Sequence, residues 1–209
     1  MPTGHSPMDH LDAPIHHRTV DGSTTTGTVT SGPAPTLTTH ARRVLAVLRI
    51  AFGFTFLWAF LDKTFALGFS TGTSPDGGTV DRFGDAAWLH GGSPTEGFLA
   101  FGADGPFKDF YNSIAGAAWA DWLFMIGLLG IGVALTIGVG MRIAAASGAL
   151  LYVLMWTVVL PPENNPLIDD HILGAITLVA LALVYAGDTW GLGRWWSRTG
   201  VVERYPALR

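Results

Sequence analysis

The chain has 209 residues, of which 49% are hydrophobic and only 13% are charged, and its formal net charge is −4. Water-soluble domains carry about 25% charged residues, so this balance favours a membrane protein. The lysines and arginines occur in small groups beside apolar stretches rather than in one stripe, which excludes nucleic acid as a predicted partner. The chain contains no cysteine, which excludes disulfides, thiolate metal sites and a thiol relay.

Residues 1–40 are rich in Thr, Gly, Pro, Ser and His and contain almost no large apolar side chains. Such a segment cannot bury enough surface to offset the entropy of ordering, so we predict a disordered cytoplasmic tail. Its loosely spaced histidines are more typical of a solvated tail than of a metal site. No apolar run with a signal-peptide cleavage site occurs here, so we expect the segment to remain attached.

Four apolar stretches predict membrane-spanning helices at about residues 44–63, 122–141, 143–160 and 167–187. A span needs about 20 apolar residues at 1.5 Å each. Arg49 interrupts the first stretch, and we expect its long side chain to reach the nearer membrane surface rather than pair within the bundle. Arg142 alone separates the second and third stretches, which predicts antiparallel neighbours. Small residues there should allow close backbone approach: Gly127, Gly130, Gly132, Gly138, Ala144 and Gly148.

The connections between these stretches differ greatly in length. Residues 64–121 form a long predicted extracytoplasmic loop, in which 95–101 and 107–118 are too short to span and favour surface helices. Pro161 and Pro162 end the third span. The fourth span should then begin with Asp169, Asp170 and His171 in its first turn.

The distribution of positive charge predicts the orientation. Arginines lie before the first span, between the second and third, and in the predicted C-terminal tail at 194–209, whereas the opposite loops are mainly acidic. The positive-inside rule then puts both termini in the cytoplasm. The expected fold is all-α: an integral membrane four-helix bundle over residues 41–193, in the cell membrane.

Antiparallel threading should bring four helix ends together on the outer side. The residues expected on this rim are Asp62, Lys63, Asp121, Asn164, Asn165, Asp169, Asp170 and His171, above the indole rings of Trp58, Trp119, Trp122 and Trp156. A carboxylate beside a histidine can relay protons to a substrate at the lipid boundary. A purely structural interpretation stays open, because aspartate stabilises a helix N-terminus, tryptophan favours interfaces, and Asp62 or Asp170 can pair with Lys63 or Arg82.

Several other chemistries find no support in the spans. Haem held by two histidines would need a second histidine within a span besides His171. The spans contain no phosphate-binding glycine loop, no zinc-ligand spacing and no serine nucleophile elbow. We therefore predict no haem, flavin or metal site.

Three stretches carry a family resemblance: RIAFGFTFLWAFLDK from Arg49 to Lys63, the glycine-rich second helix turning at Gly140–Arg142, and IDDH at Ile168–His171. Over about residues 43–190 the chain resembles the DoxX/DoxD family of four-helix membrane proteins. That family is linked to the membrane subunit of thiosulfate:quinone oxidoreductase, which passes electrons from thiosulfate to a quinone and joins two thiosulfates as tetrathionate.

The resemblance implies a quinone as cofactor and a set of site residues. Catalysis would involve His171, Asp170 and Asp62, with His171 or Asp170 exchanging protons, and the quinone would contact Trp58, Lys63, Trp119 and Asn165. Electrons would come directly from thiosulfate or through a partner redox subunit, and a homo-oligomer is a further expected arrangement.

Two other functions remain open from the sequence. The chain can be a non-catalytic scaffold or accessory subunit of a redox or respiratory complex, held through its long outer loop and its tails. A small-solute transporter is the weaker alternative, because the spans lack midplane charges and a clear internal repeat.

Overall fold

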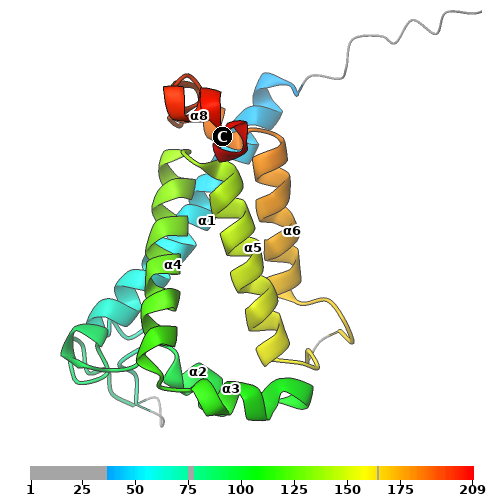
Figure 1. The fold of residues 1–209 in the computed structure, drawn as a ribbon. Coiled ribbons are helices and arrows are strands. Elements are labelled where there is room, and N and C mark those ends of the chain that lie inside the picture. Colours follow the sequence, from blue (N-terminus) through cyan, green and yellow to red (C-terminus); the bar gives the residue numbers. More distant parts are fainter. Residues whose placement is uncertain (1–36, 75–77, 164) are drawn as a thin grey trace, which may run out of the picture. The chain divides into compact units, whose positions relative to one another are not determined.

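The computed structural model describes residues 37–74, 78–163 and 165–209, and the regular elements within these ranges are helices. Residues 1–36, most of the predicted tail, lie outside the described residues, as does Asn164 of the predicted rim. Four principal helices form the bundle in Figure 1: α1 (Thr39–Phe65), α4 (Ala118–Ile137), α5 (Met141–Val158) and α6 (Asp170–Leu183). The all-α prediction is confirmed for this part of the chain.

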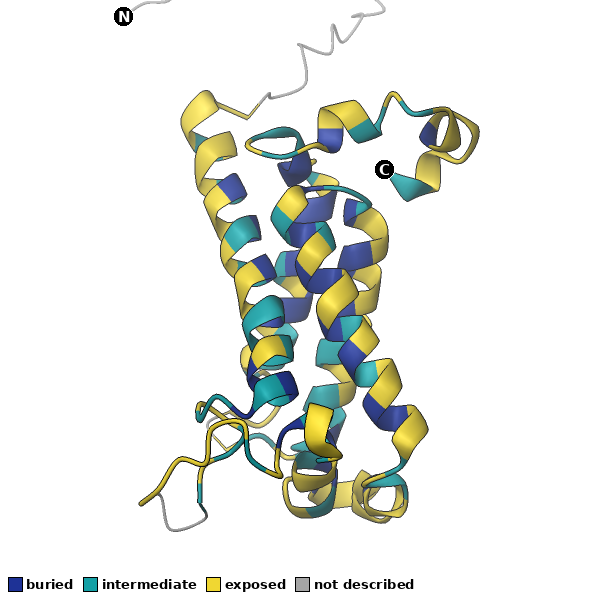
Figure 2. Ribbon diagram, turned by 90° about the vertical axis from the view of Figure 1, so that its left-hand side faces the viewer, coloured by how far each residue is buried: buried dark blue, intermediate teal, exposed yellow. Residues whose placement is uncertain are grey.

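Three of these helices, α1, α4 and α5, are long and apolar enough to cross a membrane. The fourth, α6, is apolar but has only 14 residues, about 21 Å at 1.5 Å per residue, against a hydrocarbon thickness of about 30 Å. Large apolar side chains on the helices are exposed, such as Leu123 on α4 at 68% and Leu183 on α6 at 71%. Exposed positions recur along the helices in Figure 2, as expected of a surface that faces lipid.

The turn between α4 and α5 lies earlier than the sequence suggests. α4 ends at Ile137, and Gly138 and Gly140 both have positive φ, +76° and +61°. Glycine adopts this left-handed backbone without a Cβ clash, so it ends the helix there. The prediction that Arg142 alone separates the two helices was therefore wrong, and Arg142 lies in the first turn of α5.

Glycines bring α1 close to α4. A Cβ on Gly132 would lie 2.8 Å from Leu57 Cγ, and one on Gly53 would lie 2.5 Å from Thr136 Oγ1. Both contacts are closer than real Cβ atoms tolerate, so the two backbones can approach only because these residues lack side chains. The prediction of close packing was wrong for two further glycines of α4, which face open space: Gly127 and Gly130.

Glycines also allow close packing of α5 against α6. A Cβ on Gly148 would lie 2.6 Å from Leu178 Cδ1, and one on Gly174 would lie 2.8 Å from the ring of Tyr152. The buried core of the bundle lies among α1, α4, α5 and α6 and consists mainly of Phe56, Met125, Leu128, Ile131, Leu135, Ala144, Ala145, Leu178 and Leu181.

The prediction that the Arg49 side chain reaches the nearer membrane surface was wrong. Its side chain is fully buried, and Nη1 donates to the carbonyl oxygens of Leu135 and Thr136, the latter at 2.9 Å. Nη2 donates to the carbonyl oxygens of Thr189 at 3.4 Å and Trp190 at 3.0 Å. The last carbonyls of a helix have no intrahelical donor, and Arg49 supplies that donor for α4. Pairing within the bundle, the alternative left open by the sequence, is what the structure shows.

The long loop carries two short helices, α2 (Glu96–Phe101) and α3 (Lys108–Ile114), close to the two segments predicted from sequence. Figure 1 shows them across one end of the bundle. Tyr111 of α3 lies 2.5 Å, oxygen to oxygen, from the Thr157 hydroxyl of α5, which ties this layer to the bundle. We call this end the acidic end, from its exposed carboxylates Asp81, Asp85, Glu96, Asp104, Asp109, Glu163 and Asp170.

The predicted C-terminal tail is folded. It contains α7 (Gly193–Trp196), α8 (Gly200–Arg204) and a 3-10 turn, η4 (Pro206–Leu208). The Arg142 amide donates to the Arg209 carbonyl oxygen at 3.1 Å, which holds the segment against the start of α5. The Arg209 guanidinium pairs with Asp188 at 2.9 Å.

Candidate functional site

The residues expected on one outer rim lie in separate groups. Figure 1 shows the end of α1 and the start of α6 on opposite sides of the bundle at the acidic end. The expected meeting of Asp62 with His171 is therefore absent from the described structure. The helices splay because close packing joins α1 to α4 and α5 to α6, while α1 and α6 share few contacts.

The first group surrounds Asp62, which is buried with 1% exposure. Its carboxylate accepts hydrogen bonds from the Phe69 and Ser70 amides, both at 3.0 Å, and from the Ser70 hydroxyl at 2.8 Å. Lys63 Nζ donates to the same hydroxyl at 3.3 Å. Trp58 packs edge-on against Phe69, with ring centroids 4.9 Å apart. These contacts make Asp62 the anchor of the turn that follows α1.

The second group surrounds Asp121, in the first turn of α4. Its Oδ1 accepts hydrogen bonds from the Ser93 hydroxyl at 2.8 Å and from the amide and hydroxyl of Thr95 at 3.2 and 2.6 Å. Asp121 thereby holds the loop that leads into α2. Trp119, expected to contact a quinone, is 59% exposed on α4 and takes no part in this group.

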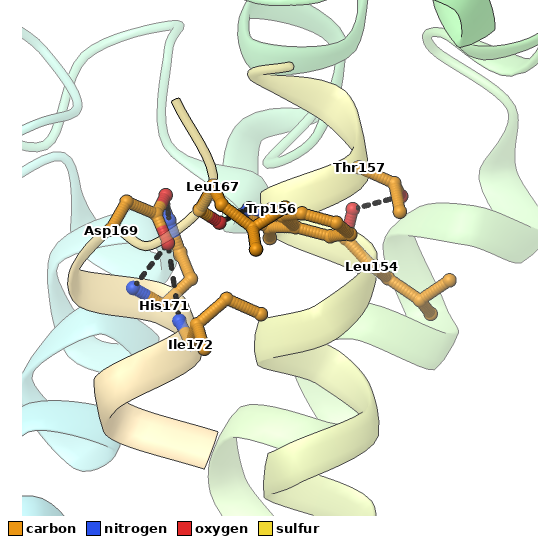
Figure 3. Close-up of polar contacts among 7 residues, drawn as sticks. All are labelled: Leu154, Trp156, Thr157, Leu167, Asp169, His171 and Ile172. Carbon is orange, nitrogen blue, oxygen red and sulfur yellow. Dashed lines mark hydrogen bonds and ion pairs between the residues drawn. The ribbon is translucent and has the colours of Figure 1, made fainter. Parts of the chain in front are cut away.

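The third group is a carboxylate–imidazole pair at the start of α6. Asp169 is the N-cap: its Oδ1 accepts from the amides of His171 and Ile172 at 3.0 and 3.1 Å. Its Oδ2 lies 2.7 Å from His171 Nδ1 (Figure 3). Because a carboxylate only accepts, Nδ1 carries a proton and Nε2 is left for a second proton or a ligand. The His171 side chain is 22% exposed.

Burial alone would raise the pKa of the Asp169 carboxyl. Hydrogen bonds from His171 and Ile172 and the charge of the imidazole outweigh that effect, so the pKa lies below its ordinary value. The carboxylate is therefore charged at neutral pH, and it orients the imidazole ring and holds it in one tautomer.

An aromatic cluster adjoins His171. The ring of Tyr152 on α5 lies 6.1 Å from the imidazole, centroid to centroid, and 5.4 Å from the ring of Phe56 on α1. Sequence reasoning missed Tyr152 as a site residue. The signal available was Gly174, one turn after His171, where the missing side chain makes room for the tyrosine ring.

Asp170 and Asn165 are close to His171 in the sequence but have different roles in the structure. Asp170 is exposed in the first turn of α6. Asn165 Oδ1 accepts from the amides of Leu167 and Ile168 at 3.0 and 3.1 Å, which shapes the loop before α6. Trp156 Nε1 donates to the Leu167 carbonyl oxygen at 3.0 Å, as Figure 3 shows. Asp170 and Asn165 are thus the predicted site residues closest to His171 in the sequence.

A crevice of about 230 Å³ at the end of α1 was not foreseen. His90 is one of its lining residues, and its Nδ1 lies 3.1 Å from the Gly84 carbonyl oxygen. That carbonyl only accepts, so this imidazole also presents Nε2 as the available nitrogen. The other lining residues are Thr64, Phe65, Phe83, Ala87 and Leu89. Among the described residues, no group of three or more His, Asp or Glu side chains is arranged to hold a metal ion.

No family model matches the chain, and neither a curated protein nor a solved structure matches it. Its chemistry must therefore be inferred from the three groups themselves.

Proposed function

We propose that this chain is the membrane subunit of a quinone-linked oxidoreductase, in which His171 exchanges protons with the quinone headgroup. The observation that supports this most strongly is the 2.7 Å contact between Asp169 Oδ2 and His171 Nδ1. Asp62, whose oxygens are occupied by the turn after α1, is better assigned to structure than to proton transfer. The proposed chemistry therefore rests on His171, with Asp169 rather than Asp170 orienting it.

The proposed proton transfer uses the free nitrogen of the imidazole. Reduction of a quinone to a quinol takes two electrons and two protons. A His171 ring protonated at Nε2 would donate one proton to a quinone oxygen and recover it from water at the membrane edge, while Asp169 keeps Nδ1–H in place. Water at the same edge would supply the second proton to the other quinone oxygen. The ring of Tyr152 offers an apolar wall beside the imidazole for an aromatic headgroup, and the buried ring of Phe56 supports it from behind.

The resemblance to DoxX-like proteins suggests the reductant. Joining two thiosulfate ions through a new S–S bond yields tetrathionate and releases two electrons, which matches the demand of one quinone. The electrons would pass directly from thiosulfate or through a partner redox subunit. No thiol is needed, in keeping with a chain that has no cysteine.

In this proposal α6 is a fourth span, and both termini are cytoplasmic in the cell membrane. The short helix would cross with the help of the 3-10 turn η3 (Ala186–Asp188) that follows it, and by local thinning of the bilayer. The acidic end, with His171, would face outward, because exposed arginines are concentrated at the other end.

The test compares two histidines in the full-length protein in lipid nanodiscs. Each has Nδ1 held by an oxygen acceptor, so His90→Ala is a matched control for His171→Ala. With a short-chain ubiquinone and added thiosulfate, we expect His171→Ala to lower quinol formation at least about 100-fold, the usual contribution of an acid–base group. His90→Ala should stay within about twofold of wild type. Loss of turnover in His90→Ala alone would move the site to the crevice, and a wild type that neither binds nor reduces quinone would refute the proposal.

The second candidate is a non-catalytic scaffold. It is favoured by the apolar side chains that the acidic end exposes, including Phe101 at 89% and Phe69 at 73%. A partner subunit could cover them. If Phe101→Ser releases a co-purifying protein from mild detergent, while His171→Ala leaves both that protein and the cellular phenotype unchanged, the scaffold function is supported instead.

A further inference from the structure

The end of the bundle opposite the acidic end is strongly basic. Six arginines there are exposed: Arg42, Arg43, Arg142, Arg194, Arg198 and Arg204. Residues 37–49, 138–145 and 184–209 contain only two acidic side chains, Asp188, which pairs with Arg209, and Glu203. We call this end the basic end. Its positive charge is therefore mostly uncompensated by the protein itself.

The C-terminal segment has both buried and exposed apolar side chains. Val202 is buried, and Trp196 Nε1 donates to the Leu208 carbonyl oxygen at 2.7 Å. These residues hold the segment together from within. Large apolar side chains elsewhere in the segment are exposed by 51–63%: Trp190, Leu192, Trp195, Val201 and Tyr205. An exposed set of this size needs a covering phase or partner.

The segment is clamped at both ends, so its outer face is a preformed surface. Arg49 binds the carbonyl oxygens of Thr189 and Trp190 at its start. Near its end, Arg142 donates through Nη1 to the Pro206 carbonyl oxygen at 3.3 Å, and its amide binds the Arg209 carbonyl. The exposed groups between these clamps need little ordering before they bind.

Three arginines of this segment keep their guanidinium groups available. Among the described residues, Arg194, Arg198 and Arg204 donate no side-chain hydrogen bond and form no ion pair; Arg204 only stacks near the Tyr205 ring, 5.7 Å from its centroid. Guanidinium groups bind phosphate oxygens in pairs, and tryptophan and tyrosine favour the headgroup region of a bilayer.

We propose that residues 190–205 form a docking surface for the anionic headgroups of the lipid leaflet at the basic end. Trp190, Trp195 and Val201 enter the interfacial region, and the three free arginines bind lipid phosphates. The segment follows α6 and the 3-10 turn η3 in the chain. The proposal does not depend on quinone chemistry. Each arginine near an anionic leaflet should favour acidic over zwitterionic lipid by about fivefold.

The test uses the absence of cysteine, which makes a single introduced thiol a unique label site. Full-length Val201→Cys carries an environment-sensitive dye in nanodiscs of phosphatidylcholine, alone or with 30% phosphatidylglycerol. We expect a blue shift in the mixed lipid that weakens in 0.5 M NaCl. Native mass spectrometry of the unlabelled protein should show phosphatidylglycerol enriched among retained lipids.

The decisive comparison is the variant Arg194→Gln/Arg198→Gln/Arg204→Gln, which leaves both clamps intact. It should lose the lipid-dependent shift and at least tenfold of the phosphatidylglycerol preference, whereas Arg82→Gln/Lys108→Gln at the acidic end should keep both. An equal shift in both lipids and in the triple variant would overturn the proposal. A label that stays in water in every bilayer would also overturn it, and would assign the surface to a protein partner.

Discussion

Replacing Arg49 by methionine is expected to destabilise the bundle strongly. The last-turn carbonyls of α4 have few donors: the Ala134 carbonyl receives the Gly138 and Val139 amides, and the Ile137 carbonyl receives the Leu192 amide. Those of Leu135 and Thr136 are paired with Arg49 alone among the described residues. Methionine fills similar space but donates nothing, so two buried carbonyls are orphaned at about 1–3 kcal/mol each, a loss of about 2–6 kcal/mol.

The assay is thermal unfolding of the purified protein in detergent and in nanodiscs. For a domain of this size each kcal/mol shifts Tm by about 2–4 °C, so we expect a fall of roughly 10 °C. Arg43→Met, exposed on the same helix, is the matched control and should change stability by no more than about 0.5 kcal/mol. Arg49→Lys should fall between them, because one ammonium cannot span all four carbonyls. Equal Tm values for Arg49→Met and Arg43→Met would show that the pairing contributes nothing and refute the reasoning.

Three further predictions concern helix packing and the hydrogen-bonded groups around Asp121 and Asp169. Gly132→Ala should cost about 1–3 kcal/mol, because its Cβ would meet Leu57, whereas Gly127→Ala, with open space beside it, should be neutral or stabilising in the same melting assay. Asp121→Ala should raise hydrogen exchange and protease cleavage around Ser93 and Thr95, with Asp121→Asn much milder because it keeps an oxygen acceptor; unchanged exchange in Asp121→Ala would contradict the anchoring role. The folded-state pKa of Asp169 is lowered, so the stability that it contributes is complete above its unfolded pKa of about 4 and is lost as pH falls through the folded value. The difference in melting between wild type and Asp169→Asn should therefore narrow as the pH falls from 7 to 3, and a difference that widens toward acid would reverse the assigned sign.

The apolar helices could be predicted because lipid imposes a simple rule on sequence. About 20 apolar residues must be continuous in the chain, so α1, α4 and α5 were identifiable from composition alone. The two short helices of the long loop, α2 and α3, were predictable for a related reason, since short mixed stretches cannot span. The start of α6 near Asp169 was expected because the apolar run after His171 is too short to span by itself, and the structure makes Asp169 the N-cap.

The site was harder to predict because an aspartate at a helix end looks the same in the sequence whether it anchors a turn or orients a catalytic group. Asp62, Asp121 and Asp169 all lie at helix ends, yet two of them anchor turns and the third orients a histidine. Their partners are as far as 28 residues away in the chain, so periodicity could not reveal them. The order of helices along the chain did not show which ends would meet.

The sequence by itself thus determined the helical class, the apolar helices and the opposite charges of the acidic and basic ends of the bundle. Each of these depends on neighbouring residues and on the solvent phase. Tertiary structure alone decided that α1 pairs with α4 and α5 with α6, through glycines that permit backbone contact at particular positions. That pairing separates Asp62 from His171 and places Arg49 against the last carbonyls of α4. Side chains of Arg49 and Arg142 in turn hold the C-terminal segment. The physical reason is that long-range packing selects among helix arrangements that a hydropathy pattern leaves equally favourable.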